Sequence, residues 1–332
     1  ILKSEITEQI QTILQERRMK YGIWLDEWFC NYIRPSSKRR TCERYSEIIE
    51  KRLKVKLGEY ELDELTPLVL QRYITELIES GNMKTGKGLA ANSVNGIITV
   101  IQNSLKLAYA LGTIKEYAAD KIRRPKTKEK EVTCFTLSEQ KKIERAALAG
   151  KKTKWLGIVV CLYTGLRIGE LLALEWKDVD FQKGMLTVSK SRHEGKDENG
   201  RYAHIVESPK TVSSRRCIPL PKQILCELRM LKRKSRSLYV ISNGESSIPV
   251  RSYQRSFERL LKKLDIPHKG FHALRHTFAT RALECGMDVK MLSELLGHKD
   301  PAVTLRRYVH SLMEQKKEMM NKVGNTYFKE AK

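Results

Sequence analysis

The chain has 332 residues, of which 41% are hydrophobic, and this is enough to give each of two ordinary domains its own core. Its 63 Lys and Arg outnumber its 39 Asp and Glu, and the net charge of +24 favours a polyanionic partner, either nucleic acid or an anionic membrane surface. No apolar run approaches the roughly 18 residues of a membrane span, and there is no signal-peptide core at the N-terminus. We therefore expect a cytoplasmic protein without a membrane segment.

The cysteines do not indicate a metal site or a disulfide framework. Their number is odd, they are scattered, and no two form a C-x-x-C pair. We expect reduced side chains that serve in packing, at Cys30, Cys42, Cys134, Cys161, Cys217, Cys226 and Cys285.

The first part of the chain is predicted to be helical. Residues 1–20 form one short polar helix or coupler. Apolar residues then recur at helical spacing, and two helix faces are predicted, one of Trp24, Leu25, Trp28, Phe29 and Tyr32 and one of Ile97, Ile98, Ile101, Leu105 and Ala108. Strand-like alternation is scarce before residue 130, so residues 21–122 are predicted to form an all-α domain.

A basic segment, KIRRPKTKEK at residues 121–130, follows this domain. Pro125 prevents a helix from continuing, so we interpret residues 123–131 as a linker between domains. Either the linker is only a solvated connection, or it follows DNA phosphates between two domains that close on a duplex. In the second case Arg123, Arg124 and Lys126 contact DNA.

The second domain, residues 132–322, is predicted to be mainly helical with a small sheet. Thr136 and Glu139 have the spacing of a capping box, and helices are expected at residues 137–149 and 154–164. GMLTVSK and RRCIPL are typical of strands, and the polar segment between them predicts a hairpin region with an inserted loop. Helices return after Pro221, and residues 323–332 are expected to form a tail.

Arg167 lies in an apolar helical run, CLYTGLRIGELLALEWKDVD. Burying a guanidinium group costs on the order of 2 to 7 kcal/mol unless it is paired. Glu170 could pair with it as a purely structural partner. Three later fragments, ESPKTVSSRRCIPL, HKGFHALRHTFATRALECG and LLGHKDPAVTLRRYVH, offer further polar groups, each with a structural explanation of its own: Lys210, His272, Arg275, His298 and Tyr308.

Taken together, these residues have the chemistry that phosphoryl transfer without a metal requires. Two guanidinium groups, Arg167 and Arg275, can neutralise the non-bridging oxygens of a phosphodiester. A tyrosine hydroxyl such as Tyr308 can form a covalent phosphoester. A lysine on a hairpin can protonate the departing oxygen.

The fragments resemble the tyrosine recombinases, the phage integrase family. TGLRIGELLALEWKDVD resembles the family's first arginine box, HALRHTFAT its His-x-x-Arg box and LGHKDPAVTLRRYVH its final box from histidine to tyrosine, in the same order and at similar spacing. The resemblance covers residues 20–322, because WLDEWFCNYI and the residues after it are similar to the family's helical core-binding domain.

The resemblance implies a fold and a mechanism. The fold is mainly α with a small antiparallel β-sheet, in which a SAM-like core-binding domain (residues 21–122) and an α+β catalytic domain (residues 132–322) form a clamp around DNA. Tyr308 attacks one strand to give a 3′-phosphotyrosine and a 5′-hydroxyl, and a 5′-hydroxyl of the partner DNA reverses the step. No ATP or other cofactor is needed. The residues assigned to the scissile phosphate are Arg167, Lys210, His272, Arg275 and His298, with Glu170 orienting the pocket.

The lysine assignment has alternatives in the same region. Lys210 is chosen because PKTVSSRRCIPL resembles the family's Lys-Thr followed by a strand that ends in Ile-Pro. The other basic residues near the hairpin are Lys190, Lys196, Arg215 and Arg216. Arg306 and Arg307, directly before Tyr308, either contact phosphate or are solvated.

A zinc site is a weaker interpretation of the second box. His272 and His276 have the i, i+4 spacing that zinc hydrolases use, but Ala273 stands where those enzymes have a glutamate. We therefore expect no metal, and His276 is predicted to make a structural hydrogen bond behind the active site.

The C-terminal tail predicts an amphipathic helix with apolar residues Leu312, Met313, Met319, Met320 and Val323. It packs either on its own domain or, as the family resemblance implies, on a neighbouring protomer in a dimer or tetramer on DNA, with accessory excision or bending proteins as further partners. The long insertion is similar to that of conjugative-transposon integrases, although residues 1–20 leave no room for their arm-binding domain.

Two other functions fit the same residues. A type IB topoisomerase uses similar chemistry but reseals the same strand, whereas a recombinase joins strands from two sites. A non-catalytic DNA-binding protein is the third interpretation, and it gives no reason for Tyr308.

Overall fold

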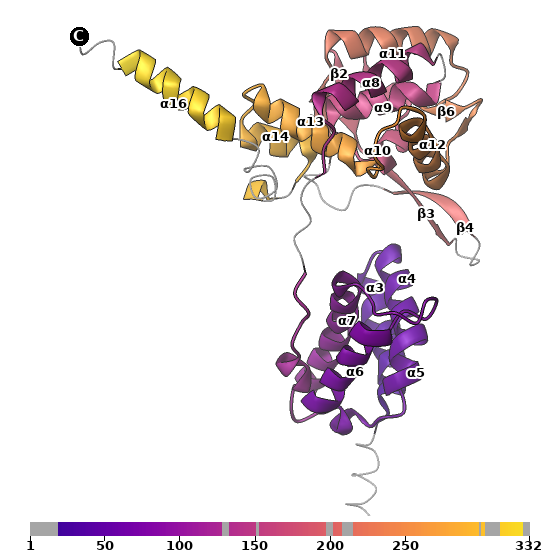
Figure 1. Ribbon diagram of the computed structural model, residues 1–332. Coiled ribbons are helices and arrows are strands. Elements are labelled where there is room, and N and C mark those ends of the chain that lie inside the picture. Colours follow the sequence, from indigo (N-terminus) through magenta and orange to yellow (C-terminus); the bar gives the residue numbers. More distant parts are fainter. Residues whose placement is uncertain are drawn as a thin grey trace, which may run out of the picture. The chain divides into compact units, whose positions relative to one another are not determined.

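The computed structural model describes residues 19–127, 133–150, 153–196, 202–207, 215–298, 300–302 and 313–327. The chain divides into two compact units, Ile1–Glu129 and Lys130–Lys332 (Figure 1). The division falls in the basic segment that was interpreted as the linker. Nearly all of the helix predicted for residues 1–20 lies outside the described residues.

The first unit is helical throughout its described residues, apart from an isolated bridge between Lys20 and Glu61. Two π-helical turns lie between its α-helices, at Phe29–Ile33 and Ile49–Leu53. The α-helices are α2 (Tyr21–Trp28), α3 (Arg34–Ser36), α4 (Arg39–Ile48), α5 (Lys54–Leu57), α6 (Pro67–Ser80) and α7 (Ala91–Ala110).

The core of the first unit forms around α7. The predicted face of this helix is confirmed, because all five of its residues are buried. Helix α2 packs through its aromatic side chains, and Trp24 Nε1 donates to the carbonyl oxygen of Ser104 at 3.1 Å. Tyr32, predicted on the same face as Trp24, is 43% exposed. The π-helical turn after Trp28 causes this error, since its wider spacing rotates the following residues away from the i, i+4 stripe.

The second unit contains the helices α8 (Leu137–Ala149), α9 (Thr153–Thr164), α10 (Ile168–Ala173), α11 (Lys222–Lys234), α12 (Val250–Lys263), α13 (His272–Glu284), α14 (Val289–Leu296) and α16 (Met313–Tyr327). The predicted capping box is confirmed: Thr136 Oγ1 accepts from the N–H of Glu139, and the Glu139 carboxylate accepts from the N–H of Thr136. Helix α9 is almost entirely apolar and packs against α8, α11 and α13, so it forms the centre of this core.

The sheet of the second unit is small and antiparallel, with strand order β1 (Val179–Asp180), β2 (Met185–Val188) and β5 (Arg216–Pro219). The two predicted strands are therefore neighbours, and Leu186 lies opposite Ile218. Between them, β3 (Ser191–Lys196) and β4 (Tyr202–Glu207) pair as the expected hairpin. A short pair that was not predicted, β6 (Ser242–Asn243) and β7 (Ser246–Ser247), completes the described strands.

Helix α16 continues to Tyr327, beyond the predicted boundary at residue 322. Met320 and Val323 are 68% and 50% exposed, so both apolar side chains face solvent to a large extent. Leu312 lies outside the described residues. None of the helices in the described part of the chain combines the length and apolar character that crossing a membrane requires.

Candidate active site

Arg167 is placed by a sharp turn between α9 and α10. Gly165 ends α9 with a positive φ of 65°, a conformation that suits glycine. Arg167 is then the residue that precedes α10, and its backbone N–H donates to Glu170 Oε2 at 2.9 Å while its Nη1 donates to Glu170 Oε1 at 2.8 Å. The Arg167 side chain is 38% exposed, so its guanidinium is fixed at one edge and reaches solvent at another.

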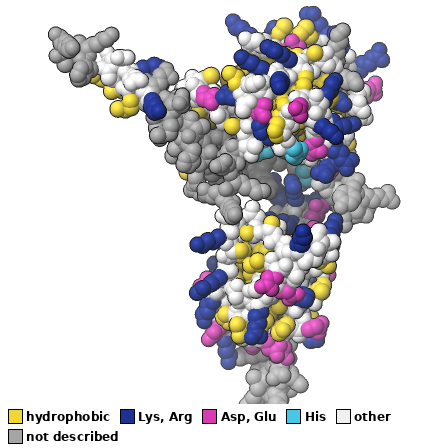
Figure 2. Space-filling model, in the orientation of Figure 1, with side chains coloured by type: hydrophobic (Ala, Val, Ile, Leu, Met, Phe, Trp, Pro, Cys, Tyr) yellow, Lys and Arg dark blue, Asp and Glu magenta, His cyan; other side chains and the backbone are white. Residues whose placement is uncertain are grey.

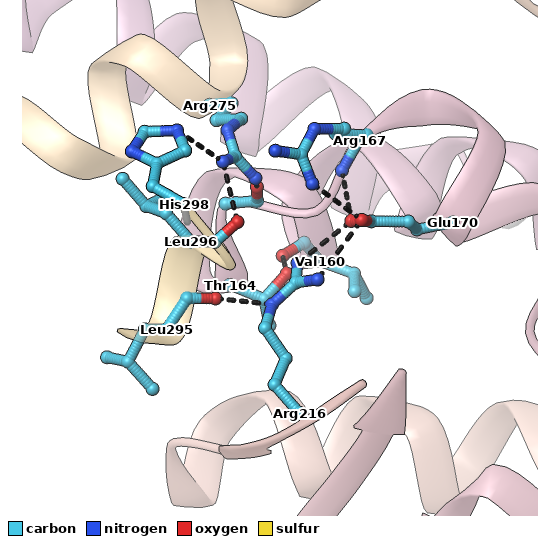
Figure 3. A network of polar contacts seen from close by, with 10 residues as sticks. Val160, Thr164, Arg167, Glu170, Arg216, Arg275, Leu295, Leu296 and His298 are labelled. Atoms are coloured by element: carbon cyan, nitrogen blue, oxygen red, sulfur yellow. Dashed lines mark hydrogen bonds and ion pairs between the residues drawn. The ribbon is translucent and has the colours of Figure 1, made fainter. Parts of the chain in front are cut away.

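Arg275, on α13, is held in a different way. Its side chain is buried, and it donates to the carbonyl oxygens of Gly165 at 2.8 Å and Leu296 at 2.6 Å (Figure 3). Its Nη2 also lies 2.9 Å from His298 Nε2. These contacts connect the turn before α10 to the end of α14, because both elements supply a backbone carbonyl to the same guanidinium.

His298 follows directly after α14. Gly297 adopts a left-handed conformation with φ of 64°, and the backbone N–H of His298 donates to the carbonyl oxygen of Ser293 at 3.0 Å. The ring is therefore placed by the helix end and reaches Arg275. Since a guanidinium can only donate, Nε2 is the acceptor in this contact.

Glu170 joins Arg167 to a third arginine, Arg216 on β5. Arg216 Nη2 and Nη1 donate to the two carboxylate oxygens of Glu170 at 2.8 and 3.1 Å. Burial raises the pKa of Glu170, but the hydrogen bonds and charge of Arg216 and the charge of Arg167 outweigh it and lower the pKa to about 2. The predicted pairing of Glu170 with Arg167 is observed.

Sequence reasoning named Arg216 only as one basic residue near the hairpin and missed this role. The sequence held one indication of this role. Arg216 and Ile218 are two residues apart on a strand, so both side chains lie on the buried face of β5, whereas Arg215 is exposed. A buried arginine needs a partner, and Glu170 was the buried acid already identified.

The two histidines of the second box contact each other. The rings of His272 and His276 pack edge to face with centroids 4.6 Å apart. His272 is exposed at the start of α13, and His276 is half-buried one turn later. Within the described ranges, no group of three or more His, Cys, Asp or Glu side chains is placed to hold a metal ion.

Lys210 lies outside the described residues, and so do Tyr308, Arg306 and Arg307. Of the other basic residues near the hairpin, Lys190 lies between β2 and β3, and its Nζ is 2.7 Å from Glu175 Oε1. The next residues pack on α10: a β-carbon at Gly169 would lie 2.5 Å from the carbonyl oxygen of Arg192 and 2.7 Å from Ser191 Oγ. The backbone at Lys190 is therefore adjacent to the helix that Arg167 precedes.

The start of the basic linker contacts α6 and α7 of the first unit. The Arg123 backbone N–H donates to Gln71 Oε1 at 2.9 Å, and the Arg124 guanidinium bonds to Gln102 and Thr99. The side chains of Arg123 and Lys126 are exposed. Arg124 is exposed as well, so all three side chains reach solvent, and Arg124 in addition bonds within the unit.

The charge of the cluster suits an anion. Glu170 is shared between Arg167 and Arg216, and Arg275 donates to backbone carbonyl oxygens, so the cluster holds three guanidinium groups and one carboxylate. Guanidinium N–H groups held in fixed positions are suitable donors to the non-bridging oxygens of a phosphate. Lys and Arg side chains are also spread over the visible face of each unit in Figure 2, and such a basic surface suits a polyanion.

Two family models match this chain. Residues 128–315 match the model described as "Phage integrase family", and residues 21–78 match "Phage integrase, N-terminal SAM-like domain". The chain belongs to the phage integrase family, and it is a tyrosine-type site-specific recombinase.

Among its relatives, a "Tyrosine recombinase XerC-like" protein of Caldanaerobacter subterraneus is 29% identical, over 92% of this chain and 83% of that protein. The "Transposase from transposon Tn916" of Enterococcus faecalis is 25% identical, over 89% of this chain and 75% of the transposase. A structure of the Tn1549 transposon integrase with transposon right end DNA is 21% identical with a TM-score of 0.77, and covers 92% of this chain and 100% of that one. This last comparison supports the fold.

Proposed function

We propose that the protein is the integrase of a mobile element, which cleaves and rejoins DNA through a 3′-phosphotyrosine on Tyr308 and thereby mediates integration and excision. The observation that carries the proposal is the set of contacts that Arg275 makes. Its guanidinium connects the turn before α10 to the end of α14, and it contacts His298. Residues from three separate sequence boxes therefore meet in one site.

In the proposed reaction, Arg167 and Arg275 stabilise the negative charge that builds up on the non-bridging oxygens during attack. His272 and His298 complete the set of donors around the phosphate. The Tyr308 hydroxyl releases its proton to solvent and its oxygen forms a bond to phosphorus, while the bond to the 5′ oxygen breaks and that oxygen takes a proton from a lysine. A 5′-hydroxyl from the partner DNA reverses the step, so the phosphoester bond is conserved without ATP or a metal.

Two lysines compete for the role of proton donor. Lys210 follows from the resemblance of its flanking residues to the family pattern. The packing of Ser191 and Arg192 on Gly169 favours Lys190, because it brings the neighbouring backbone next to α10. A substrate with sulfur in place of the 5′ bridging oxygen needs no proton donor, so it should restore cleavage in the variant of the true donor, Lys190→Ala or Lys210→Ala, and in no other.

We propose that the DNA partner is a duplex contacted by both units, with Arg123, Arg124, Lys126, Arg306 and Arg307 among the phosphate contacts. Each neutralised phosphate lowers the logarithm of the affinity by about 0.9 per logarithmic unit of salt. The site of action is then the bacterial cytoplasm, where the DNA lies.

We propose assembly to a dimer or tetramer on DNA through α16. Its exposed Met320 and Val323 are apolar side chains that a second protomer would cover. A lambda integrase tetramer bound to a Holliday junction shares the fold, with a TM-score of 0.64 and 22% identity, over 89% of this chain and 87% of that one. Accessory excision or bending proteins would act on this assembly.

The test uses nicked duplexes that carry the joined ends of candidate mobile elements. Cleavage near the nick releases a short fragment and traps the intermediate, so a denaturation-resistant adduct is expected for the wild type and for Tyr163→Phe, a control on the surface of α9. Tyr308→Phe should give none. An adduct that persists in Tyr308→Phe would exclude Tyr308 as nucleophile, and products that never join two sites would favour a topoisomerase.

A further inference from the structure

Arg216 occupies the first position of β5, opposite Val188 of β2, with its side chain only 6% exposed. It lies in the same fragment as Lys210, but the proposed mechanism gives it no role. It is nevertheless at the centre of the polar network drawn in Figure 3, between α10 and the end of α14.

All three ends of the Arg216 guanidinium are fixed. Nε donates to the carbonyl oxygen of Leu295 at 2.6 Å, and Nη1 and Nη2 donate to separate oxygens of Glu170. A β-carbon at Gly297 would lie 3.0 Å from Nη1, so the backbone after α14 also approaches the group closely. The two bonds from Arg216 to Glu170 fix the plane of the carboxylate as well as its position.

The same two carboxylate oxygens hold Arg167. Oε2 accepts from the Arg167 backbone N–H and Oε1 accepts from its guanidinium. If Glu170 had only Arg167 as a cation, the two would form a closed, neutral pair, and the charge needed at a phosphate would be cancelled. With Arg216 present, the three groups carry a net positive charge, and Arg167 is held at one edge without being neutralised.

We propose that Arg216 is a positioning residue for strand cleavage: it fixes and neutralises Glu170, and Glu170 in turn aims Arg167 at the scissile phosphate. This inference rests on the proposed function, since it assigns Arg216 to the same reaction. It goes beyond an ordinary buried ion pair, which would stabilise the fold and leave the chemical step alone.

The test is Arg216→Lys, which keeps a positive charge but loses the planar fork. Two quantities are measured, the equilibrium affinity for the duplex and the single-turnover rate of adduct formation on a nicked duplex. We expect affinity within about threefold of the wild type and a rate lower by about 10- to 100-fold. The matched control is Arg229→Lys on α11, where an exposed arginine also donates to a backbone carbonyl, that of Phe181. It should change neither quantity.

A second variant guards against misfolding. Arg216→Met combined with Glu170→Gln removes both buried charges, so no unpaired ion remains in the core. It should bind DNA and show the same slow cleavage. Cleavage at the wild-type rate in either variant, or a loss fully matched by lost DNA binding, overturns the inference. Absence of any adduct with the wild type is a different result, because it contradicts the proposed function itself.

Discussion

Arg167, directly before α10, and Arg275, within α13, belong to the same cluster but are held by different kinds of partner. Arg275 is buried and bonded to two backbone carbonyls and a histidine ring, and none of these three groups carries a negative charge. Arg167 is partly exposed and bonded to a carboxylate. A carboxylate gives stronger orientation but reduces the charge, and the structure offsets this by adding Arg216 on the other side of Glu170.

The largest effect is expected from Arg275→Lys. A lysine cannot donate to the Gly165 and Leu296 carbonyls and approach His298 in one plane, so a buried acceptor is left unsatisfied at about 1 to 3 kcal/mol. Cleavage should fall by about 10²- to 10³-fold. Urea unfolding and single-turnover cleavage measure the two losses, and an unchanged unfolding free energy would contradict the packing role.

Arg167→Lys should separate function from stability more cleanly. Because the side chain is partly exposed, we expect a loss in unfolding free energy below about 1 kcal/mol. DNA binding should persist while cleavage falls by about 100-fold, since a point charge does not reproduce the guanidinium fork. Equal losses of binding and cleavage in a gel-shift and cleavage comparison would return Arg167 to a structural role.

The Glu170 carboxylate predicts a pH dependence of stability. Its pKa of about 2 in the folded chain lies below the ordinary value of 4.5, because the hydrogen bonds and charge of Arg216 and the charge of Arg167 outweigh the effect of burial. The ion-pair contribution is therefore complete above pH 4.5 and is lost as the pH falls from 4.5 towards 2.

The lowered pKa of Glu170 corresponds to a contribution of about 3 kcal/mol to the free energy of unfolding. Unfolding titrations between neutral pH and pH 2 should show a smaller acid loss in Glu170→Gln than in the wild type. Identical pH profiles would show that the carboxylate is not stabilised in the folded state.

The smallest effect is expected from Gly297→Ala. The residue has a left-handed conformation, and the added methyl group would lie 3.0 Å from Arg216 Nη1. A loss of about 1 to 2 kcal/mol follows from the backbone strain and crowding. Gly286→Ala, which has φ of 87° but open space around its β-carbon position, is the matched control for strain alone. If thermal unfolding shows equal losses for the two variants, the close approach to Arg216 has no energetic consequence.

Local patterns predicted the local parts of this structure. The capping box gave the start of α8, apolar periodicity gave the buried face of α7, and the spacing of Arg167 and Glu170 gave their contact. Tyr32 was misplaced because periodicity does not reveal a π-helical turn.

The contacts between residues far apart in the sequence could not be predicted in this way. The contact of Arg216 with Glu170 joins a strand to a helix start, and it depends on the pairing register of β5 with β2. The packing of the Lys190 region on α10 likewise depends on how the hairpin docks. No local spacing encodes either contact.

The central claim, that this cluster serves a covalent attack by tyrosine, is tested most directly by mass spectrometry of the trapped adduct. After nuclease and protease digestion, one peptide should carry a nucleotide attached through its 3′ phosphate. We expect this modification on the peptide that contains Tyr308, in the wild type and not in Tyr308→Phe. A nucleotide on any other residue, or one attached through a 5′ phosphate, would contradict it.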